Sequence, residues 1–287
     1  MTGTLLDVTD LRVAFRRRGF RAQPIEVLHG VSLHVGAGET VGLVGESGSG
    51  KTTIGRTVLG LVKPSGGSIR FEGREIGRLG ARERRALAKD IQVVFQDPYS
   101  SLNPSMTIGA ILTEPLVVQG ATARDARARV RTLLDQVGLP ADAAERLPRE
   151  FSGGQRQRIA IARAIAPQPR LIVCDEPVSA LDLSTQARVL DLFIDIQRRT
   201  GTAYLFISHD LAVVRHISHR VAVLYRGDLV ETGPAATVTS TPDHPYTRKL
   251  LLAAPVADPI EQHKRRKERR LISLPLIDAE SLDRRGG

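Results

Sequence analysis

Residues 41–53 read Val-Gly-Leu-Val-Gly-Glu-Ser-Gly-Ser-Gly-Lys-Thr-Thr, an apolar run followed by a glycine-rich loop. This order predicts a buried strand, a tight loop and then a helix, which is the context in which such a loop binds phosphate. The glycines let backbone N–H groups turn inward, and the helix N-terminus adds a positive dipole. We therefore expect nine consecutive residues to hold a nucleotide: Gly45, Glu46, Ser47, Gly48, Ser49, Gly50, Lys51, Thr52 and Thr53.

Two residues of this loop carry specific chemistry. Lys51 would reach the β- and γ-phosphates, and Thr52 would ligate Mg²⁺. The alternative is a glycine-rich turn that ends in Lys-Thr by chance, which the flanking strand and helix disfavour. The loop alone does not separate kinases, GTPases, helicases and transport ATPases.

A second motif, Leu171-Ile172-Val173-Cys174-Asp175-Glu176, is an apolar run that ends in two carboxylates. A buried strand of this kind would deliver Asp175 to its carboxyl end, where Asp175 can organise Mg²⁺. Glu176, one residue later, can polarise an attacking water. In isolation the same pattern is a strand that ends in an acidic turn. Cys174 is expected to be a small core residue.

The hydrophobic pattern predicts a mixed α/β chain. Short apolar runs at 5–8, 11–15 and 31–35 favour a small antiparallel layer before the strand at 41–44. The continuous apolar runs at 171–174 and 204–207 are typical of parallel strands that are covered on both faces.

Further elements are expected along the chain. A helix over 122–137 would be capped by Thr122, with Asp125 completing a capping box, and would end at Gly138. The remaining expectations are a helix over 52–61, a strand over 91–95, a hairpin around Arg226-Gly227-Asp228, and a short helix beyond Thr241.

The chain has 287 residues, a net charge of +10 and one cysteine. One cysteine excludes an internal disulfide, and no apolar run reaches the ~18–20 residues that cross a bilayer. The N-terminus lacks the pattern of a secretory signal. Because no apolar run is long enough to cross a bilayer, a transport role would need separate membrane subunits. Much of the positive charge lies in two clusters, in which Phe20 is the single aromatic residue among the charges. We interpret the clusters as solvated segments, which disfavours nucleic acid as a partner and leaves anionic lipid open. The clusters are Arg16, Arg17, Arg18 and Arg21, and Lys264, Arg265, Arg266, Lys267, Arg269 and Arg270.

The stretch Phe151-Ser152-Gly153-Gly154-Gln155 narrows the field. Ser152 is expected to cap a helix that begins at Gly153 and to aim its positive end at a phosphate. Together with the loop, the acidic strand, Gln96 and His209, in this order and spacing, the stretch resembles the signature of ATP-binding cassette (ABC) proteins. A kinase or GTPase is disfavoured by the signature and by His209.

The resemblance implies a role for each matching residue. Gln96 would contact Mg²⁺ and the attacking water and would report to the membrane subunits. His209 would hold the γ-phosphate and Glu176. The signature residues would meet ATP bound to a partner subunit, and Asp182 would cross the dimer interface. Phe15 is the favoured residue for stacking on adenine, with Phe20 as the alternative and a plain core phenylalanine as the third interpretation. The signature residues are Ser152, Gly153, Gly154 and Gln155.

The resemblance also implies the architecture: an α/β phosphate-loop NTPase core with a mostly parallel sheet and an N-terminal antiparallel layer. We expect this core over 1–96 and 166–241. A helical subdomain with the signature would occupy 97–165, and a short C-terminal extension would occupy 242–287.

Three stretches are similar to the ATPases of peptide-type importers. They are Phe95 to Pro104, Pro177 to Gln186, and Pro242-Asp243-His244-Pro245-Tyr246-Thr247. Many such relatives bind an iron–sulfur cluster through cysteines in the extension, but no cysteine follows Cys174 here. We therefore predict no cluster.

The resulting expectation is an ATPase, with ATP and Mg²⁺ as cofactors, that powers import of peptides or a related small solute. Its partners would be a second ATPase subunit (a different paralogue is favoured), two permease subunits and, indirectly, an extracytoplasmic solute-binding protein. It would lie on the cytoplasmic face of the membrane as a peripheral protein. The alternatives are a soluble cassette ATPase, such as a phosphonate-degradation accessory protein, and a ribosome- or DNA-associated cassette.

Overall fold

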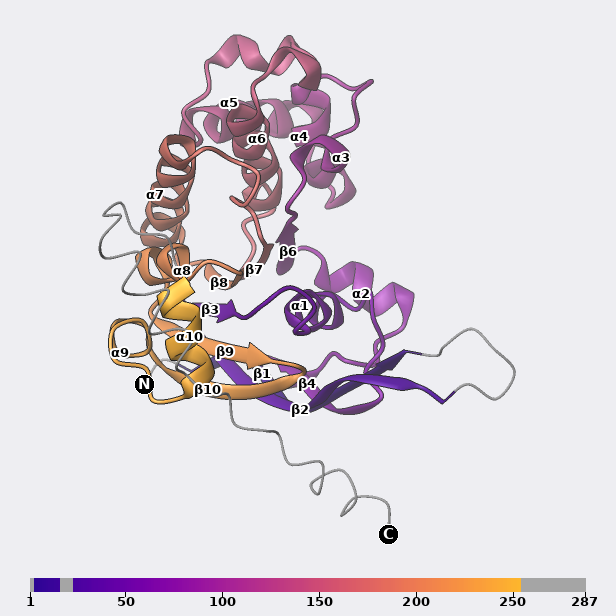
Figure 1. The fold of residues 1–287 in the computed structure, drawn as a ribbon. Coiled ribbons are helices and arrows are strands. Elements are labelled where there is room, and N and C mark those ends of the chain that lie inside the picture. The colour runs from indigo at the N-terminus through magenta and orange to yellow at the C-terminus, as the bar shows by residue number, and fades with distance from the viewer. Residues whose placement is uncertain (1–2, 16–22, 254–287) are drawn as a thin grey trace.

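The computed structural model describes residues 3–15 and 23–253. One of its two sheets is antiparallel, has four strands in the order β2-β1-β4-β5, and forms the lower layer in Figure 1. Its position agrees with the antiparallel layer expected near the N-terminus. The strands are β1 (Thr4–Phe15), β2 (Ile25–Gly36), β4 (Gly66–Phe71) and β5 (Arg74–Glu75).

The first two strands are longer than the apolar runs predict. The runs at 5–8 and 11–15 are two halves of β1, and the run at 31–35 is the second half of β2. The pairing between β1 and β2 is irregular between Val8 and Leu11, where Asp10 has φ 48°. On the paired strand β2, Gly30 has φ 102°. A bulge of this kind interrupts the alternation of side chains without ending the strand.

The second sheet has six strands in the order β10-β9-β3-β8-β7-β6, and only β10 pairs antiparallel. Both faces of this sheet are buried. On β8, Tyr204 and Phe206 pack with the helices, whereas Leu205 and Ile207 pack toward α1 and the antiparallel layer. The strands are β3 (Thr40–Val44), β6 (Ile91–Val94), β7 (Leu171–Asp175), β8 (Ala203–Ser208), β9 (Arg220–Tyr225) and β10 (Asp228–Pro234).

Two helices belong to the part of the chain between β3 and β6. Helix α1 (Lys51–Val58) follows the phosphate loop and is shorter than the predicted 52–61. It ends early because the chain turns at Gly60, which has φ 73°. Helix α2 (Ala81–Leu87) comes after β5.

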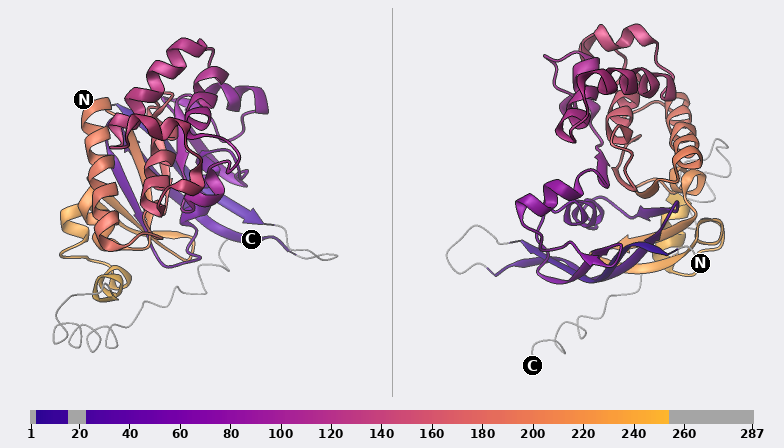
Figure 2. Two further views of the ribbon diagram at one scale, coloured as in Figure 1. Left: turned by 90° about the horizontal axis from the view of Figure 1, so that it is seen from above. Right: turned by 180° about the vertical axis from the view of Figure 1, so that it is seen from behind.

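Residues between β6 and β7 are mainly helical and lie at the top of Figure 1, away from the antiparallel sheet; Figure 2 shows the same separation from behind. Their apolar cluster continues onto Ile172 and Phe206 of the central sheet. The boundaries 97 and 165 of a separate subdomain therefore stay a prediction. The helices are α3 (Pro98–Ser101), α4 (Ile108–Val118), α5 (Ala123–Gln136), α6 (Gly153–Ile165) and two 3₁₀ turns at Ala141–Glu145 and Pro148–Glu150.

The expected cap of α5 is present. The side chain of Thr122 accepts a hydrogen bond of 3.2 Å from the N–H of Asp125. Asp125 in turn accepts a hydrogen bond of 2.6 Å from the Thr122 hydroxyl. The cap is therefore confirmed, while the acidic partner binds the hydroxyl and not the backbone N–H of a capping box.

The C-terminal part completes the edge of the central sheet. The expected hairpin joins β9 and β10 through Arg226 and Gly227, whose φ angles of 48° and 88° suit a two-residue hairpin turn. The basic cluster at 264–270 and the arginines at 16–21 lie outside the described residues. The helices here are α7 (Leu183–Thr200), α8 (Leu211–Ile217), α9 (Ala235–Val238) and α10 (Pro245–Ala253).

Over the described ranges, 3–15 and 23–253, none of the helices has both the length and the apolar character needed to cross a bilayer.

Candidate functional site

The phosphate loop is packed so closely that its first and last glycines have no room for a side chain. A methyl group at Gly45 would overlap the backbone oxygen of Leu224. One at Gly50, which has φ 108°, would lie 2.6 Å from Cδ2 of Leu28. The neighbouring strands β2 and β9 therefore hold the loop from outside, and its glycines let the other N–H groups of the loop turn toward a phosphate.

Lys51 lies under this loop and is 4% exposed. Its Nζ donates hydrogen bonds of 2.8 Å to the backbone oxygens of Gly45 and Glu46. Burial lowers the pKa of Lys51, and the carboxylates of Glu176, Asp175 and Glu46 oppose that shift. A buried cation with only carbonyl hydrogen bonds is well suited to pairing with an anion.

Thr52 and Asp175 meet as the sequence predicts. The Thr52 hydroxyl donates a hydrogen bond of 2.9 Å to Oδ1 of Asp175, although the two residues are 123 positions apart. Burial raises the pKa of Asp175, and the Thr52 hydrogen bond partly offsets it. A hydroxyl and a carboxylate are the hard oxygen ligands that Mg²⁺ takes beside substrate phosphates, so this pair fits the expected ion.

A nucleotide also fits the loop itself. The Ser49 hydroxyl is buried, and it has no hydrogen-bond partner among the described residues. Buried polar groups are normally paired, so an unpaired hydroxyl in a phosphate loop is suited to bind an anionic ligand. No group of three or more His, Cys, Asp or Glu that could hold a metal by itself occurs in 3–15 and 23–253. Mg²⁺ is commonly bound by one or two protein oxygens together with substrate phosphates, and the pair of Thr52 and Asp175 suits such an ion.

Glu176 and His209 form a second pair at the same end of the central sheet. Nδ1 of His209 lies 3.0 Å from Oε2 of Glu176. Glu176 has φ 50°, a conformation that costs energy in a residue with a side chain. Its backbone N–H is fixed by a 3.0 Å hydrogen bond to the oxygen of Ile207 in β8. The carboxylate of this strained residue contacts His209.

Gln96 lies at the same edge but is not drawn into these contacts. Strands β6 and β7 run parallel with Val94 opposite Cys174. Gln96, two residues after β6, and Asp175, the last residue of β7, therefore both lie at the carboxyl ends of the strands. Gln96 is exposed and has no hydrogen bond to any described residue. Its predicted role toward Mg²⁺ and water stays a prediction.

The signature begins helix α6 in the predicted way. The Ser152 side chain accepts a hydrogen bond of 3.3 Å from the N–H of Gln155, and the Gln155 side chain accepts one of 2.9 Å from the N–H of Ser152. This reciprocal pair is a capping box. Gly154 lies against Thr185, and a methyl group there would overlap Cγ2 of Thr185. A methyl group at Gly153 would meet only Cδ2 of Leu181, at 4.0 Å.

The signature lies apart from the phosphate loop of the same chain. Ser152, Gly154 and Gln155 line a cavity of about 660 Å³ together with Arg158 and Arg188, and no residue of 45–53 lines it. In Figure 1, α6 lies in the upper part of the molecule and α1 in the lower part. One chain therefore does not close its own signature over its own loop.

Asp182 caps α7, the helix that follows the acidic strand. Its carboxylate accepts hydrogen bonds of 2.7 Å from the Ser184 hydroxyl and 2.9 Å from the N–H of Thr185. These two bonds hold the pKa of Asp182 well below its usual range. Asp182 is thus an anion next to Leu183, which is 84% exposed. Both features suit a surface that meets another subunit, as predicted for Asp182.

Phe15 is the last residue of β1 and pairs with Ile25 of β2. The two side chains are 45% and 50% exposed. An exposed aromatic residue is available for stacking, so the alternative of a plain core phenylalanine is wrong. Phe20 lies outside the described residues. The assignment of Phe15 to adenine therefore stays a prediction.

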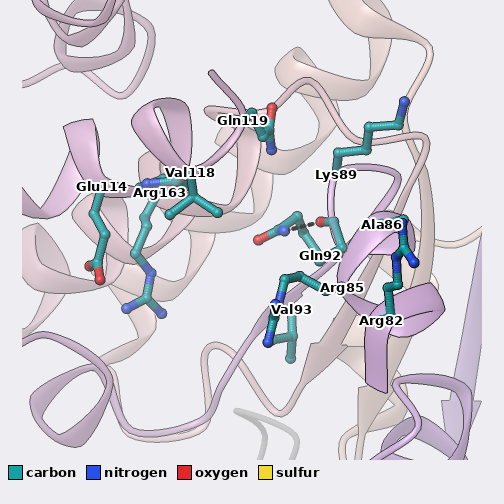
Figure 3. A pocket seen from close by; sticks show the side chains of 12 residues that line it. Arg82, Arg85, Ala86, Lys89, Gln92, Val93, Glu114, Val118, Gln119 and Arg163 are labelled. Carbon is teal, nitrogen blue, oxygen red and sulfur yellow. Dashed lines mark hydrogen bonds between the residues drawn. The ribbon is translucent and has the colours of Figure 1, made fainter. Parts of the chain in front are cut away.

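A separate cavity of about 740 Å³ lies between β6 with α2 on one side and α4 on the other. Figure 3 shows basic side chains of α2 and the following turn on one side, and Val118 of α4 with Gln119 directly after it on the other. Arg163 of α6 lies beside Glu114. Residues 45–53 and 171–176 do not line this cavity. Its basic residues are Arg82, Arg85, Lys89 and Arg163.

Tyr246 contacts the site, although the sequence does not predict such a contact. Its hydroxyl accepts a hydrogen bond of 2.8 Å from the backbone N–H of Glu46 in the phosphate loop. The stretch 242–247 was singled out only by resemblance. A tyrosine in the first turn of a helix carries no sequence signal for a contact 200 positions away.

Comparison with known proteins agrees with this geometry. The ABC transporter family model matches residues 28–179, which include the loop, the signature and the acidic strand. The glutathione import ATP-binding proteins GsiA of Escherichia coli (strain K12) and of Shigella boydii serotype 4 (strain Sb227) are 54% identical over 243 residues. That match covers 84% of this chain and 39% of each relative, so the chain spans about two fifths of their length.

Two solved structures are similar in fold. CbiO1 from Clostridium perfringens, part of the ABC transporter complex CbiONQ, has a TM-score of 0.74 and 25% identity over 83% of this chain and 91% of its own. The ATP-binding cassette MJ0796, solved as a post-hydrolysis dimer with ADP and Pi, has a TM-score of 0.72 and 28% identity over 80% of this chain and 98% of its own. The α/β phosphate-loop fold class is thereby confirmed, and the chain belongs to the ABC transporter family.

Proposed function

We propose that this chain is the ATP-hydrolysing subunit of an importer for peptides or a related small solute. It would act through separate permease subunits from the cytoplasmic face of the membrane. The observation that carries the proposal is that three groups converge at the carboxyl ends of the parallel strands. They are Lys51 under its loop, Thr52 with Asp175, and Glu176 with His209. These are the groups that phosphoryl transfer needs for charge neutralisation and for orienting a nucleophile.

Each residue of this constellation has a distinct task in the proposed reaction. Lys51 offsets charge on the β- and γ-phosphates. Thr52 and Asp175 would hold Mg²⁺, which neutralises the phosphate oxygens when it is bound. Glu176 orients and deprotonates the attacking water as general base, while His209 fixes the Glu176 carboxylate and faces the γ-phosphate.

The proposed site is completed by a second subunit. The signature of this chain lies apart from its own loop, so it is available to ATP held by a partner. The capped N-terminus at Ser152 would direct the positive end of α6 at that phosphate. The dimeric state of the cassette MJ0796 supports this arrangement. A different paralogue is the favoured partner, because peptide-type importers, which this chain resembles, often pair two ATPases.

The solute class rests on two observations. The first is the resemblance of residues 242–247 to the extension of peptide-importer ATPases. The second is the 54% identity to proteins that are named for import of glutathione, which is a tripeptide. We therefore propose a short peptide or a peptide-like solute, delivered by an extracytoplasmic binding protein.

We place the contact with the permease at the cavity between α2 and α4. Val117 and Val118, at the end of α4, are 50% and 73% exposed, and Val118 lines the cavity. Gln92 and Val93 line it from β6, only a few residues before Gln96. A partner that enters here would act on the segment that leads directly to Gln96, which is the coupling role predicted for that residue.

Purification of the tagged chain from membranes of its own host tests the proposal. We expect two apolar permease subunits and a second ATPase to copurify, and ATP hydrolysis to be lost in the Lys51→Ala variant. Val118→Asp should release the permease subunits while leaving MgATP binding intact. Copurification with a soluble enzyme complex in place of permeases would contradict the proposal and favour the accessory-protein alternative.

A further inference from the structure

The C-terminal helix α10 touches the phosphate loop through one hydroxyl. The Oη of Tyr246 accepts a hydrogen bond of 2.8 Å from the backbone N–H of Glu46. Tyr246 is 1% exposed, so this bond is shielded from water. Hydrogen bonds in such an environment are electrostatically stronger than exposed ones.

Packing fixes the ring that carries this hydroxyl. The ring centroids of Tyr246 and Tyr225 are 4.3 Å apart, with an interplanar angle of 40°. Both residues belong to an apolar cluster with Val44, the last residue of β3 before the loop. Burial raises the pKa of Tyr246 to about 12, so its hydroxyl is neutral at physiological pH.

The turn that leads into α10 is anchored to the edge of the central sheet. The carboxylate of Glu231 in β10 accepts hydrogen bonds of 2.9 Å from the N–H of Asp243 and 3.2 Å from the N–H of His244. Nδ1 of His244 accepts a bond of 3.1 Å from the N–H of Tyr246. Tyr246 is therefore held by the sheet, the turn and its own core cluster.

The peptide groups on the two sides of Glu46 link Tyr246 to Lys51. The N–H of Glu46 bonds to Tyr246, and its carbonyl oxygen accepts a hydrogen bond of 2.8 Å from Nζ of Lys51. A displacement of Glu46 would move an acceptor that orients the lysine ammonium. The hydroxyl of Tyr246 thus acts on Lys51 through the loop backbone.

We propose that Tyr246 is a positioning residue of the nucleotide site, which holds the phosphate loop and Lys51 in the conformation that receives the β- and γ-phosphates. This inference rests on the proposed function of the loop as an ATP site. It gives helix α10 a part in nucleotide binding, although α10 lies beyond the residues 28–179 that the family model matches.

The test compares MgATP affinity of the full 287-residue chain and its variants by calorimetric titration. Tyr246→Phe removes the hydroxyl and keeps the ring. We expect the Kd for MgATP to rise about three- to tenfold, the scale of one lost hydrogen bond. The nucleotide-free variant should melt a few degrees lower, because the N–H of Glu46 loses its partner. The increase in melting temperature on adding MgATP should shrink as well. If Tyr246 had a purely structural role, the variant would lower the melting temperature of the nucleotide-free chain and leave the increase on adding MgATP unchanged.

Tyr225→Phe is the matched control, because its ring lies in the same pair and its hydroxyl makes no hydrogen bond to a described residue. Its Kd for MgATP should equal that of the unaltered chain. Equal affinities of Tyr246→Phe and the unaltered chain would overturn the inference, as would an equal loss in Tyr225→Phe. If the unaltered chain showed no affinity for MgATP, or Lys51→Ala bound it equally well, the proposed ATP site would fail and this inference with it.

Discussion

The imidazole of His209 lies 3.0 Å from the carboxylate of Glu176, and the two side chains differ in exposure, 56% against 18%. The carboxylate is therefore shielded while the ring reaches outward. Glu176 sits at the end of a central strand in a strained backbone conformation, so its direction is set by the fold. His209 then holds the carboxylate from the open side. This pair is the element on which the proposed hydrolysis depends.

Replacement of Glu176 by Gln should separate binding from chemistry. The amide keeps the size and the hydrogen-bonding oxygen of the side chain but cannot accept a proton. We expect MgATP binding to persist, a stable ATP-bound dimer to accumulate, and hydrolysis to fall by at least ~10²-fold. Phosphate release and light scattering measure these quantities. Unchanged turnover in the variant would show that another group activates the water.

Replacement of His209 by Ala should also reduce hydrolysis, to a smaller extent. Residues that orient a reacting group typically change activity by about 10- to 100-fold. Because His209 is more than half exposed, its removal should leave the melting temperature nearly unchanged. A rate equal to that of the unaltered chain would mean that the contact with Glu176 has no role in the reaction.

Replacement of Asp175 by Asn should stabilise the nucleotide-free chain and inactivate it. Burial raises the pKa of Asp175, so the ionised form is disfavoured in the folded state. The stability linked to this group is complete below the ordinary pKa and is lost as the pH rises through the folded pKa. At neutral pH the neutral amide avoids that loss, and its oxygen can still accept the hydrogen bond from Thr52.

We therefore expect the Asp175→Asn variant to melt a few degrees higher than the unaltered chain at pH 7, on the scale of about 2–4 °C per kcal/mol for a domain of this size. The difference should shrink as the pH falls toward the ordinary pKa of an aspartate. Mg²⁺-dependent hydrolysis should be lost. A lower melting temperature at neutral pH would contradict the assigned cause of the pKa shift.

The two glycines of the signature should differ in their tolerance of a methyl group. Gly154→Ala forces a methyl group onto Thr185, and overpacking of this kind costs about 1–3 kcal/mol. Gly153→Ala meets only Leu181 at 4.0 Å and is the matched control for stability. The double variant Gly154→Ala with Thr185→Ser removes the overlapping methyl and should recover most of the loss. Denaturant unfolding measures the stabilities of the two single variants and the double variant. Equal stabilities of Gly153→Ala and Gly154→Ala would refute the overlap with Thr185 as the cause.

Local features of this chain were predictable from sequence. The caps at Thr122 and Ser152 need only residues three positions apart, and the buried strands at 171–174 and 204–207 are continuous apolar runs. The phosphate loop is likewise contained within 13 consecutive residues, 41–53. Each of these rests on short-range chemistry that a sequence displays directly.

Long-range pairings were not predictable from the residues alone. Strand β4 pairs with β1 about 60 positions earlier. It begins with Gly66 and Gly67, and only Ile69 and Phe71 alternate within it, so its local signal is short. The contact of Tyr246 with Glu46 joins positions 200 apart. The strained φ of Glu176 follows from the packing of the strand end, and a glutamate has no preference for that conformation. These features depend on tertiary structure, which overrides local preference.

The central claim is that ATP held by residues 45–53 is hydrolysed only when the signature of another subunit closes on it. The most direct measurement is the ATPase rate per chain as a function of the concentration of cassettes, either copies of this chain or the second ATPase subunit. The account predicts a specific rate that rises steeply with concentration and is lost in Ser152→Arg, while the isolated variant binds MgATP with unchanged affinity. A specific rate that is independent of concentration and survives Ser152→Arg would contradict it.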